Sequence, residues 1–198
     1  MLNGKHIILG ITGSIAAYKA AMLCRLLVKE GAEVRVVMTP LAKQFITPLT
    51  MATLSKHPIL VEFFNPENGE WNSHISLGEW ADCYVIAPAT ANVLCKMANG
   101  IADDALTTTF AAMRKPVVIA PAMNTNMYES PATQKAIDEL SRWSNITMLD
   151  AASGELACGT TGKGRMQEIE TIVAAAEYAL TPKTLTNKHV LITAGPTQ

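Results

Sequence analysis

The sequence has little charge. Asp, Glu, Lys and Arg make up 17% of the 198 residues, and the formal net charge is -1. Without a basic stripe, the chain offers no surface that would attract nucleic acid or an anionic membrane. Hydrophobic residues reach 49%, which fits either a large buried parallel sheet or extensive subunit interfaces. The length suits one sizeable domain better than two.

The chain also lacks a long apolar segment. No apolar run reaches the roughly 18 residues that span a bilayer, and residues 1–5 show no signal-peptide pattern. The cysteines are widely spaced and form no CxxC pair, which favours neither zinc nor a disulfide framework. We therefore predict a cytoplasmic protein with reduced thiols and no metal site, in which Cys24, Cys83 and Cys95 are core residues.

The N-terminal region predicts a strand, a turn, a helix and a second strand. Residues 6–11 form a short apolar run rich in β-branched side chains, which is typical of a buried parallel strand. A helical pattern follows and ends at Gly31, where a left-handed cap is expected. Residues 33–38 predict the second strand. This order opens an α/β domain with a doubly wound, Rossmann-like parallel sheet.

The turn after the first strand is a candidate anion site. Gly10 and Gly13 allow a ligand to approach the backbone, and Ser14 lies next to the free amides of a helix start. The spacing Gly-x-x-Gly-Ser differs from the dinucleotide pattern Gly-x-Gly-x-x-Gly, and Thr39 follows the second strand where an NAD site prefers an acidic residue. NAD is therefore disfavoured. A mononucleotide phosphate with Thr39 as a second polar contact fits better, and a plain tight turn is the alternative.

Two more buried strands are predicted at residues 82–88 and 115–121, and each ends in Ala-Pro before a small polar run. Open α/β sheets bind ligands at the carboxyl ends of their strands. Thr90, Asn92 and Asn124 follow these strands and are neutral donors and acceptors, suited to a flat heteroaromatic ring or a carboxylate. One such loop would fit structural capping, but two matched loops and the first turn together favour a site.

Residues 154–166 form a glycine-rich segment, with four glycines in its first eleven residues. Such a content argues against a regular helix or strand. The segment also carries Cys158 and Arg165. It predicts a mobile loop that closes over a substrate and brings a thiol to it, and the alternative is a surface loop with an incidental cysteine.

The remaining segments are less informative. A lone histidine such as His74 is more often a surface or capping residue than a catalyst, and no metal partner lies at ligand spacing. Residues 169–180 predict a last helix, and 188–198 start another strand and a glycine turn. We therefore expect one domain over residues 1–180, and a linker with the start of a truncated further domain over residues 181–198.

These motifs resemble those of the flavin-dependent cysteine decarboxylases. The resemblance is strongest to the N-terminal half of bacterial bifunctional phosphopantothenoylcysteine decarboxylase/phosphopantothenate–cysteine ligase, and it spans nearly the whole chain in order. Thr90 stands where the family often has Ser, and this keeps the hydroxyl. Residues 188–198 resemble the opening of the ligase half. The other matching segments are residues 13–19, 74, 88–92, 121–128, 157–159 and 164–166.

The resemblance implies FMN and the conversion of 4'-phosphopantothenoylcysteine to 4'-phosphopantetheine and carbon dioxide in coenzyme A biosynthesis. The implied route is oxidation of the thiol side to a thioaldehyde, decarboxylation, and reduction of the enethiolate. His74 would assist the oxidative and decarboxylation steps, Asn124 would hold the substrate carboxylate, and Cys158 would donate a proton. The implied FMN contacts are Gly13, Ser14, Ile15, Thr39, Thr90 and Asn92, and the implied substrate contacts are Asn124, Met127, Ala157, Cys158 and Arg165.

The family also implies homotrimers, commonly assembled into dodecamers, with active sites between subunits. Two other hypotheses stay open. In the first, the chain is a non-catalytic flavin-binding or regulatory relative; the joint retention of His74, Asn124 and Cys158 argues against it. In the second, it is an NAD-dependent oxidoreductase; the missing dinucleotide-binding pattern Gly-x-Gly-x-x-Gly argues against this.

Overall fold

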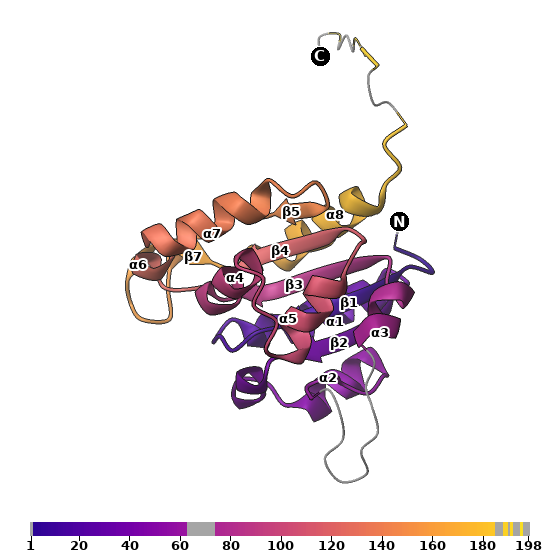
Figure 1. Cartoon of the computed structure of the whole chain (residues 1–198), viewed down its shortest axis with the longest axis horizontal. Coiled ribbons are helices and arrows are strands. Elements are labelled where there is room, and N and C mark those ends of the chain that lie inside the picture. Colours follow the sequence, from indigo (N-terminus) through magenta and orange to yellow (C-terminus); the bar gives the residue numbers. More distant parts are fainter. Residues whose placement is uncertain (1, 63–73, 185–187, 190, 192–194, 196–198) are drawn as a thin grey trace.

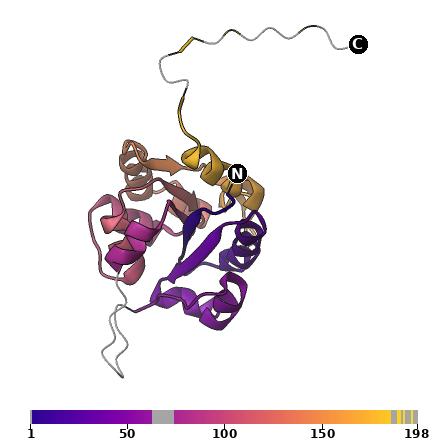
Figure 2. The same cartoon turned by 90° about the vertical axis from the view of Figure 1, so that its right-hand side faces the viewer.

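The computed structural model describes residues 2–62 and 74–184 together with positions 188, 189, 191 and 195; of residue 74 only the backbone is described. A five-stranded parallel sheet forms its centre, in the order β2-β1-β3-β4-β5, with helices on both faces (Figures 1 and 2). This is one of the common orders of doubly wound α/β sheets. The strands are β1 (His6–Ile11), β2 (Glu33–Met38), β3 (Cys83–Ala89), β4 (Val117–Pro121) and β5 (Ile146–Met148).

The helices divide between two hydrophobic layers. One layer holds α1 (Ala17–Lys29), α2 (Pro48–Ser55) and α8 (Ile169–Leu180). The other holds α3 (His74–Trp80), α4 (Ala91–Ala98), α5 (Ala105–Ala112) and α7 (Pro131–Ser141). A short 3-10 helix, η1 (Pro40–Gln44), follows β2, and a single helical turn, α6 (Thr125–Tyr128), follows β4.

Successive residues of a strand pack alternately into the two hydrophobic layers. In β1, Ile7 and Leu9 pack with α1 and α8, whereas Ile8 packs with the opposite layer. Strands buried on both faces are continuously apolar, which is why the strands near residues 6–11, 82–88 and 115–121 were predictable. The strand near residues 33–38 has half-buried Glu33 and Arg35 and was predictable from its valines. The structure confirms these strands, and it confirms the helix over 169–180 and the α/β, doubly wound Rossmann-like fold.

The cysteine predictions are confirmed for two residues. Cys24 and Cys83 are fully buried, and burial raises the pKa of their thiols to about 11 and about 12. Cys95 of α4 is only half-buried, packed against one of the two core clusters, and its thiol donates to the carbonyl of Ala132 on α7.

The prediction that residues 154–166 have no regular structure is wrong. They contribute to an antiparallel hairpin of β6 (Ala152–Glu155) and β7 (Thr161–Arg165), and only its tip is a loop. Gly164 allows the hairpin to pack closely against the loop after β4, because a Cβ atom at this position would overlap the carbonyl oxygen of Met123. The φ angle of Gly164 is +151°, in a region that side chains disfavour.

Within the described residues, no helix combines the length and the apolar character that crossing a membrane requires. The strand expected over residues 188–198 lies largely outside the described residues. The division at residue 180 therefore stays a prediction, although the last described helix does end at Leu180.

Candidate active site

The carboxyl ends of β1 and β3 form the switch point of the sheet, because β1 pairs with β2 on one side and with β3 on the other. Thr12 joins the two strand ends. Its buried hydroxyl donates to the carbonyl oxygen of Pro88 at 2.7 Å and accepts from the amide of Thr90 at 3.2 Å. Ligands of open α/β sheets bind at such a point. Thr12 was not predicted, since nothing in the sequence marks this threonine among others.

The turn between β1 and α1 presents unpaired amides. The Ser14 hydroxyl accepts a hydrogen bond from the amide of Ala16 at 3.2 Å. Among the described residues, no acceptor faces the amides of Gly13, Ser14 and Ile15. They precede a 13-residue helix, whose N-terminus favours an anion.

A buried hydroxyl lies beside this turn. The amide of Thr39 donates to the carbonyl of Ile11 at 3.0 Å, which fixes Thr39 at the end of β1. Its Oγ1 atom is buried and has no hydrogen-bond partner among the described residues. A buried hydroxyl without a partner costs free energy, which a polar ligand would recover. The turn and this hydroxyl together suit the phosphate of a mononucleotide.

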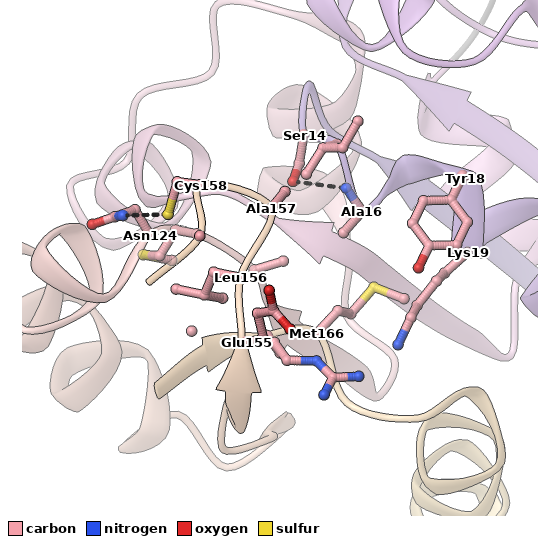
Figure 3. A pocket seen from close by; sticks show the side chains of 16 residues that line it. Ser14, Ala16, Tyr18, Lys19, Asn124, Glu155, Leu156, Ala157, Cys158 and Met166 are labelled. Atoms are coloured by element: carbon pink, nitrogen blue, oxygen red, sulfur yellow. Dashed lines mark hydrogen bonds between the residues drawn. The ribbon is translucent and has the colours of Figure 1, made fainter. Parts of the chain in front are cut away.

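Asn124 presents its amide group to the cavity beside it. It caps α6, and its Oδ1 atom accepts from the amide of Asn126 at 2.8 Å. This bond turns the Nδ2 atom toward the hairpin, where it donates to the Sγ atom of Cys158 at 3.1 Å (Figure 3). Nδ2 has two protons, so one donor remains for a ligand.

Cys158 lies exposed at the hairpin tip. The Thr160 hydroxyl is 3.1 Å from its sulfur atom. Hydrogen bonds from the Thr160 hydroxyl, the Thr160 backbone and the Asn124 amide stabilise the thiolate, and they lower the pKa of the Cys158 thiol from its ordinary value.

The hairpin is fixed to the loop after β4. The amide of Met123 donates to the carbonyl of Gly164 at 2.9 Å. On the outer side, Lys163 Nζ is 2.7 Å from the Asp150 carboxylate, to which the Tyr128 hydroxyl also donates at 3.0 Å. Cys158 is therefore carried by an anchored support rather than by a free loop.

A cavity of about 780 Å³ lies between the first turn, the loop after β4 and the hairpin. This volume is typical of small-molecule sites. Charged side chains of Lys19 and Glu155 also line it. The cavity brings together six of the predicted site residues, namely Ser14, Ile15, Asn124, Ala157, Cys158 and Arg165.

Other predicted residues lie near the same sheet edge but do not line this cavity. Gly13 adjoins Ser14, Thr39 follows β2, and Thr90 is the N-cap residue of α4. Asn92 is exposed in the first turn of α4, and Met127 is 49% exposed on α6.

None of the described residues of α3, the helix that His74 begins, lines the cavity. The side chain of His74 lies outside the described residues. In Figure 1, α3 lies on the opposite side of the molecule from α6 and β7.

Replacement of Gly164 by alanine should loosen the hairpin. We expect the free energy of unfolding to fall by about 1–3 kcal/mol, because the new Cβ atom combines a strained φ with an overlap at Met123. Chemical denaturation measures this change. Gly100→Ala is the control, since Gly100 also has a positive φ but no atom within 4 Å of an added Cβ. Equal losses in the two variants would show that packing against Met123 contributes nothing.

Curated relatives match the entire chain. It is 47% identical over 201 residues to the coenzyme A biosynthesis bifunctional protein CoaBC of Bacillus subtilis, covering 100% of this chain and 49% of that protein. It is 50% identical over 197 residues to CoaBC of Vibrio cholerae, with the same coverage. The chain thus spans about half the length of the curated relatives it matches.

Solved structures match the fold and the family. A PPC decarboxylase variant complexed with pantothenoylaminoethenethiol is 34% identical with a TM-score of 0.77, covering 89% of this chain and 98% of that chain. The FMN-dependent cysteine decarboxylase SpaF is 30% identical with a TM-score of 0.75, covering 91% of this chain and 100% of that chain. The flavoprotein family profile matches residues 1–180, and the chain belongs to the flavoprotein family.

Proposed function

We propose that this chain is an FMN-dependent decarboxylase that converts 4'-phosphopantothenoylcysteine to 4'-phosphopantetheine and carbon dioxide. The curated relatives are named for coenzyme A biosynthesis, and the structural relatives include a PPC decarboxylase. One observation in this chain carries the proposal. The Asn124 amide and the Cys158 thiol lie 3.1 Å apart at one cavity, so that a carboxylate and the carbon next to it would meet a donor and an acid together.

FMN fits the residues at the sheet edge. The amides of Gly13, Ser14 and Ile15 would hold its phosphate, the unpartnered Thr39 hydroxyl would supply a further polar contact, and Thr90 and Asn92 would contact the remainder from the end of β3. Bound FMN supplies the capacity to accept and return two electrons.

The substrate carboxylate is assigned to Asn124. Its Oδ1 atom accepts from the Asn126 amide, and its Nδ2 donor faces the cavity. A neutral donor holds a carboxylate without compensating its charge fully, which suits a group that must leave as neutral carbon dioxide. Loss of carbon dioxide from an ordinary cysteine would leave an unstabilised carbanion, and prior oxidation at the thiol side provides the electron sink.

Cys158 is assigned as the proton donor in the second half of the reaction. The enethiolate left after decarboxylation needs a proton on carbon, and the exposed thiol at the hairpin tip can reach a ligand in the cavity. The lowered pKa of the thiol makes it a better acid. His74 is assigned to the first half, the oxidation and decarboxylation.

We infer that a second copy of this chain completes the site, in homotrimers or multiples of them. Ile15 in the turn before α1, and Tyr18 and Met22 on α1, are 61%, 57% and 56% exposed. Their spacing places them on one apolar face. Ile15 and Tyr18 also line the cavity, which a neighbouring copy on this face would border. That copy would also bring its own His74 to the site.

Replacing Met22 by glutamate should therefore dissociate the oligomer, because the charge would be buried in the interface. Light scattering should give a multiple of three chains for the parent and smaller species for the variant. Tyr178→Glu on α8 is the control, since Tyr178 is 66% exposed on another helix. A parent protein that is monomeric at micromolar concentration would contradict the inference.

The full-length protein is proposed to carry a phosphopantothenate–cysteine ligase domain as well, since its curated relatives are bifunctional and about twice as long. Residues 181–198 would form the linker and the start of that domain. The proposed location is the cytoplasm, where the four free cysteines stay reduced.

Turnover of the purified protein tests the function. With 4'-phosphopantothenoylcysteine, it should release carbon dioxide and 4'-phosphopantetheine in equal amounts, without added nicotinamide. Mass spectrometry of the yellow chromophore should identify FMN. FMN binding without carbon dioxide release would favour the non-catalytic alternative, and recovery of FAD or NAD would contradict the cofactor assignment.

A further inference from the structure

One end of the cavity carries a pair of cations that the proposed chemistry does not use. Lys19 of α1 and Arg165 of β7 both line the cavity. The carboxylate of Glu168 joins them, 3.3 Å from Lys19 Nζ and 3.5 Å from Arg165 Nη2. In Figure 3, Lys19 lies on the opposite side of the cavity from Asn124 and Cys158, with Leu156 and Met166 between them.

The surroundings of Lys19 direct its charge toward this point. Its side chain is only 15% exposed, although it is a long cationic side chain on the first turns of α1. Burying the stem of a lysine along a cavity wall places the ammonium at a defined position. Arg165 adds a planar guanidinium that can bind a phosphate with two parallel hydrogen bonds.

Glu168 marks where an anionic ligand would bind. Its side chain is 58% exposed, and its two ion pairs are long, so they contribute little to stability. A ligand dianion would attract both cations more strongly than one exposed carboxylate does. Glu155 also lines the cavity and offsets one of the two positive charges. Displacement of Glu168 therefore leaves this end of the cavity with a net positive charge.

We propose that Lys19 and Arg165 form the subsite for the phosphate monoester of the substrate, and that Glu168 pairs with the two cations until the substrate phosphate displaces it. The inference rests on the proposed function. 4'-Phosphopantothenoylcysteine has its carboxylate and thiol at one end and its phosphate at the other. The cavity has the same polarity, with the Asn124 and Cys158 pair at one end and the two cations at the other.

The same chemistry would suit the phosphate of FMN, so the experiment must separate the two sources. The test compares kcat/KM for 4'-phosphopantothenoylcysteine and for pantothenoylcysteine, which lacks the phosphate. Isothermal titration with both compounds gives binding independently of turnover. The variants are Lys19→Gln, Arg165→Gln and Glu168→Gln, and FMN content is measured from absorbance for each.

We expect Lys19→Gln and Arg165→Gln each to lower kcat/KM for the phosphorylated compound by about tenfold to a hundredfold. For pantothenoylcysteine the change should stay below about threefold, since that compound makes no charged contact there. Glu168→Gln should bind the phosphorylated compound more tightly. Lys96→Gln is the matched control: Lys96 lies on α4, does not line the cavity and pairs with Asp103, so both compounds should react as with the parent.

Three results would overturn the subsite. Equal losses of kcat/KM for both compounds would show that the cations support the shape of the cavity and do not bind the phosphate. Lost affinity for FMN but not for riboflavin, with unchanged discrimination between the substrates, would assign them to the FMN phosphate. Unchanged binding of the phosphorylated compound in both cation variants would leave them no role. A parent protein that binds the phosphorylated compound through Lys19 but turns over neither compound would instead refute the proposed reaction alone.

Discussion

The Cys158→Ala protein should release carbon dioxide from 4'-phosphopantothenoylcysteine and yet form almost no 4'-phosphopantetheine. Proton delivery belongs to the second half of the reaction, so removal of the thiol leaves oxidation and decarboxylation intact. A positioned general acid contributes roughly a hundredfold to ten-thousandfold, and we expect a loss of phosphopantetheine formation in that range. Mass spectrometry of single-turnover mixtures should detect the oxidised enethiol as the accumulating product.

Two control variants separate the thiol's role from damage to the site. Cys95→Ala removes a half-buried thiol on α4 and should leave both products unchanged. His74→Asn should stop carbon dioxide release itself. Full phosphopantetheine yield from the Cys158→Ala protein would refute the assignment of the proton donor.

The pH dependence of the parent protein tests the assignment of Cys158 as proton donor in a second way. The donor must be protonated, and hydrogen bonds from Thr160 and Asn124 lower the pKa of the Cys158 thiol from its ordinary value. Phosphopantetheine formation should therefore decline as pH rises through that lowered pKa, whereas carbon dioxide release continues. Parallel decline of both products would place the titrating group in the first half instead.

Strands β1, β3 and β4 were predictable from sequence because they are buried on both faces and are continuously apolar. The short edge strand β5, with three half-buried residues, was not predicted. Helix α5 gave no comparable signal. The sequence of α5, ALTTTFAA, has three threonines, and its start is fixed by a capping box in which Asp104 and Thr107 bond each other's backbone. The usual capping box has Glu or Gln where this helix has Thr107, so the sequence does not show the usual signature.

The hairpin shows where composition misleads. Four glycines suggested an irregular loop, because glycine weakens strands when no other group replaces its missing contacts. Here the backbone of the loop after β4 replaces them, with a hydrogen bond from Met123 to Gly164. That contact joins segments about forty residues apart, which no local pattern reports.

The site was predictable in part for a related reason. Residues placed after parallel strands must meet at one edge, and this brought Ser14 and Asn124 to a common cavity. The partners that tune them were not predictable. Thr12 and Glu168 act through contacts between segments far apart in the sequence, and Thr160 acts through the turn at the hairpin tip. Nothing in their sequence context distinguishes them from other polar residues.

The second large effect is expected at Asn124. The Asn124→Asp protein should keep its fold and its FMN, because aspartate caps a helix as well as asparagine does and can still accept from the amide of Asn126. Decarboxylation should fall at least about a hundredfold, because the change removes the amide donors and sets a second negative charge against the substrate carboxylate.

The neighbouring asparagine provides a matched control. Asn126→Asp introduces the same charge two residues away, on an exposed side chain whose backbone amide still binds Asn124. If the loss came from a general negative field, both variants would lose activity together; if it came from the amide donors, only the Asn124→Asp protein would. Carbon dioxide release under saturating FMN distinguishes the two cases. Turnover of the Asn124→Asp protein within a few-fold of the parent would remove Asn124 from the carboxylate site, since a like charge cannot hold the group that a neutral donor is proposed to hold.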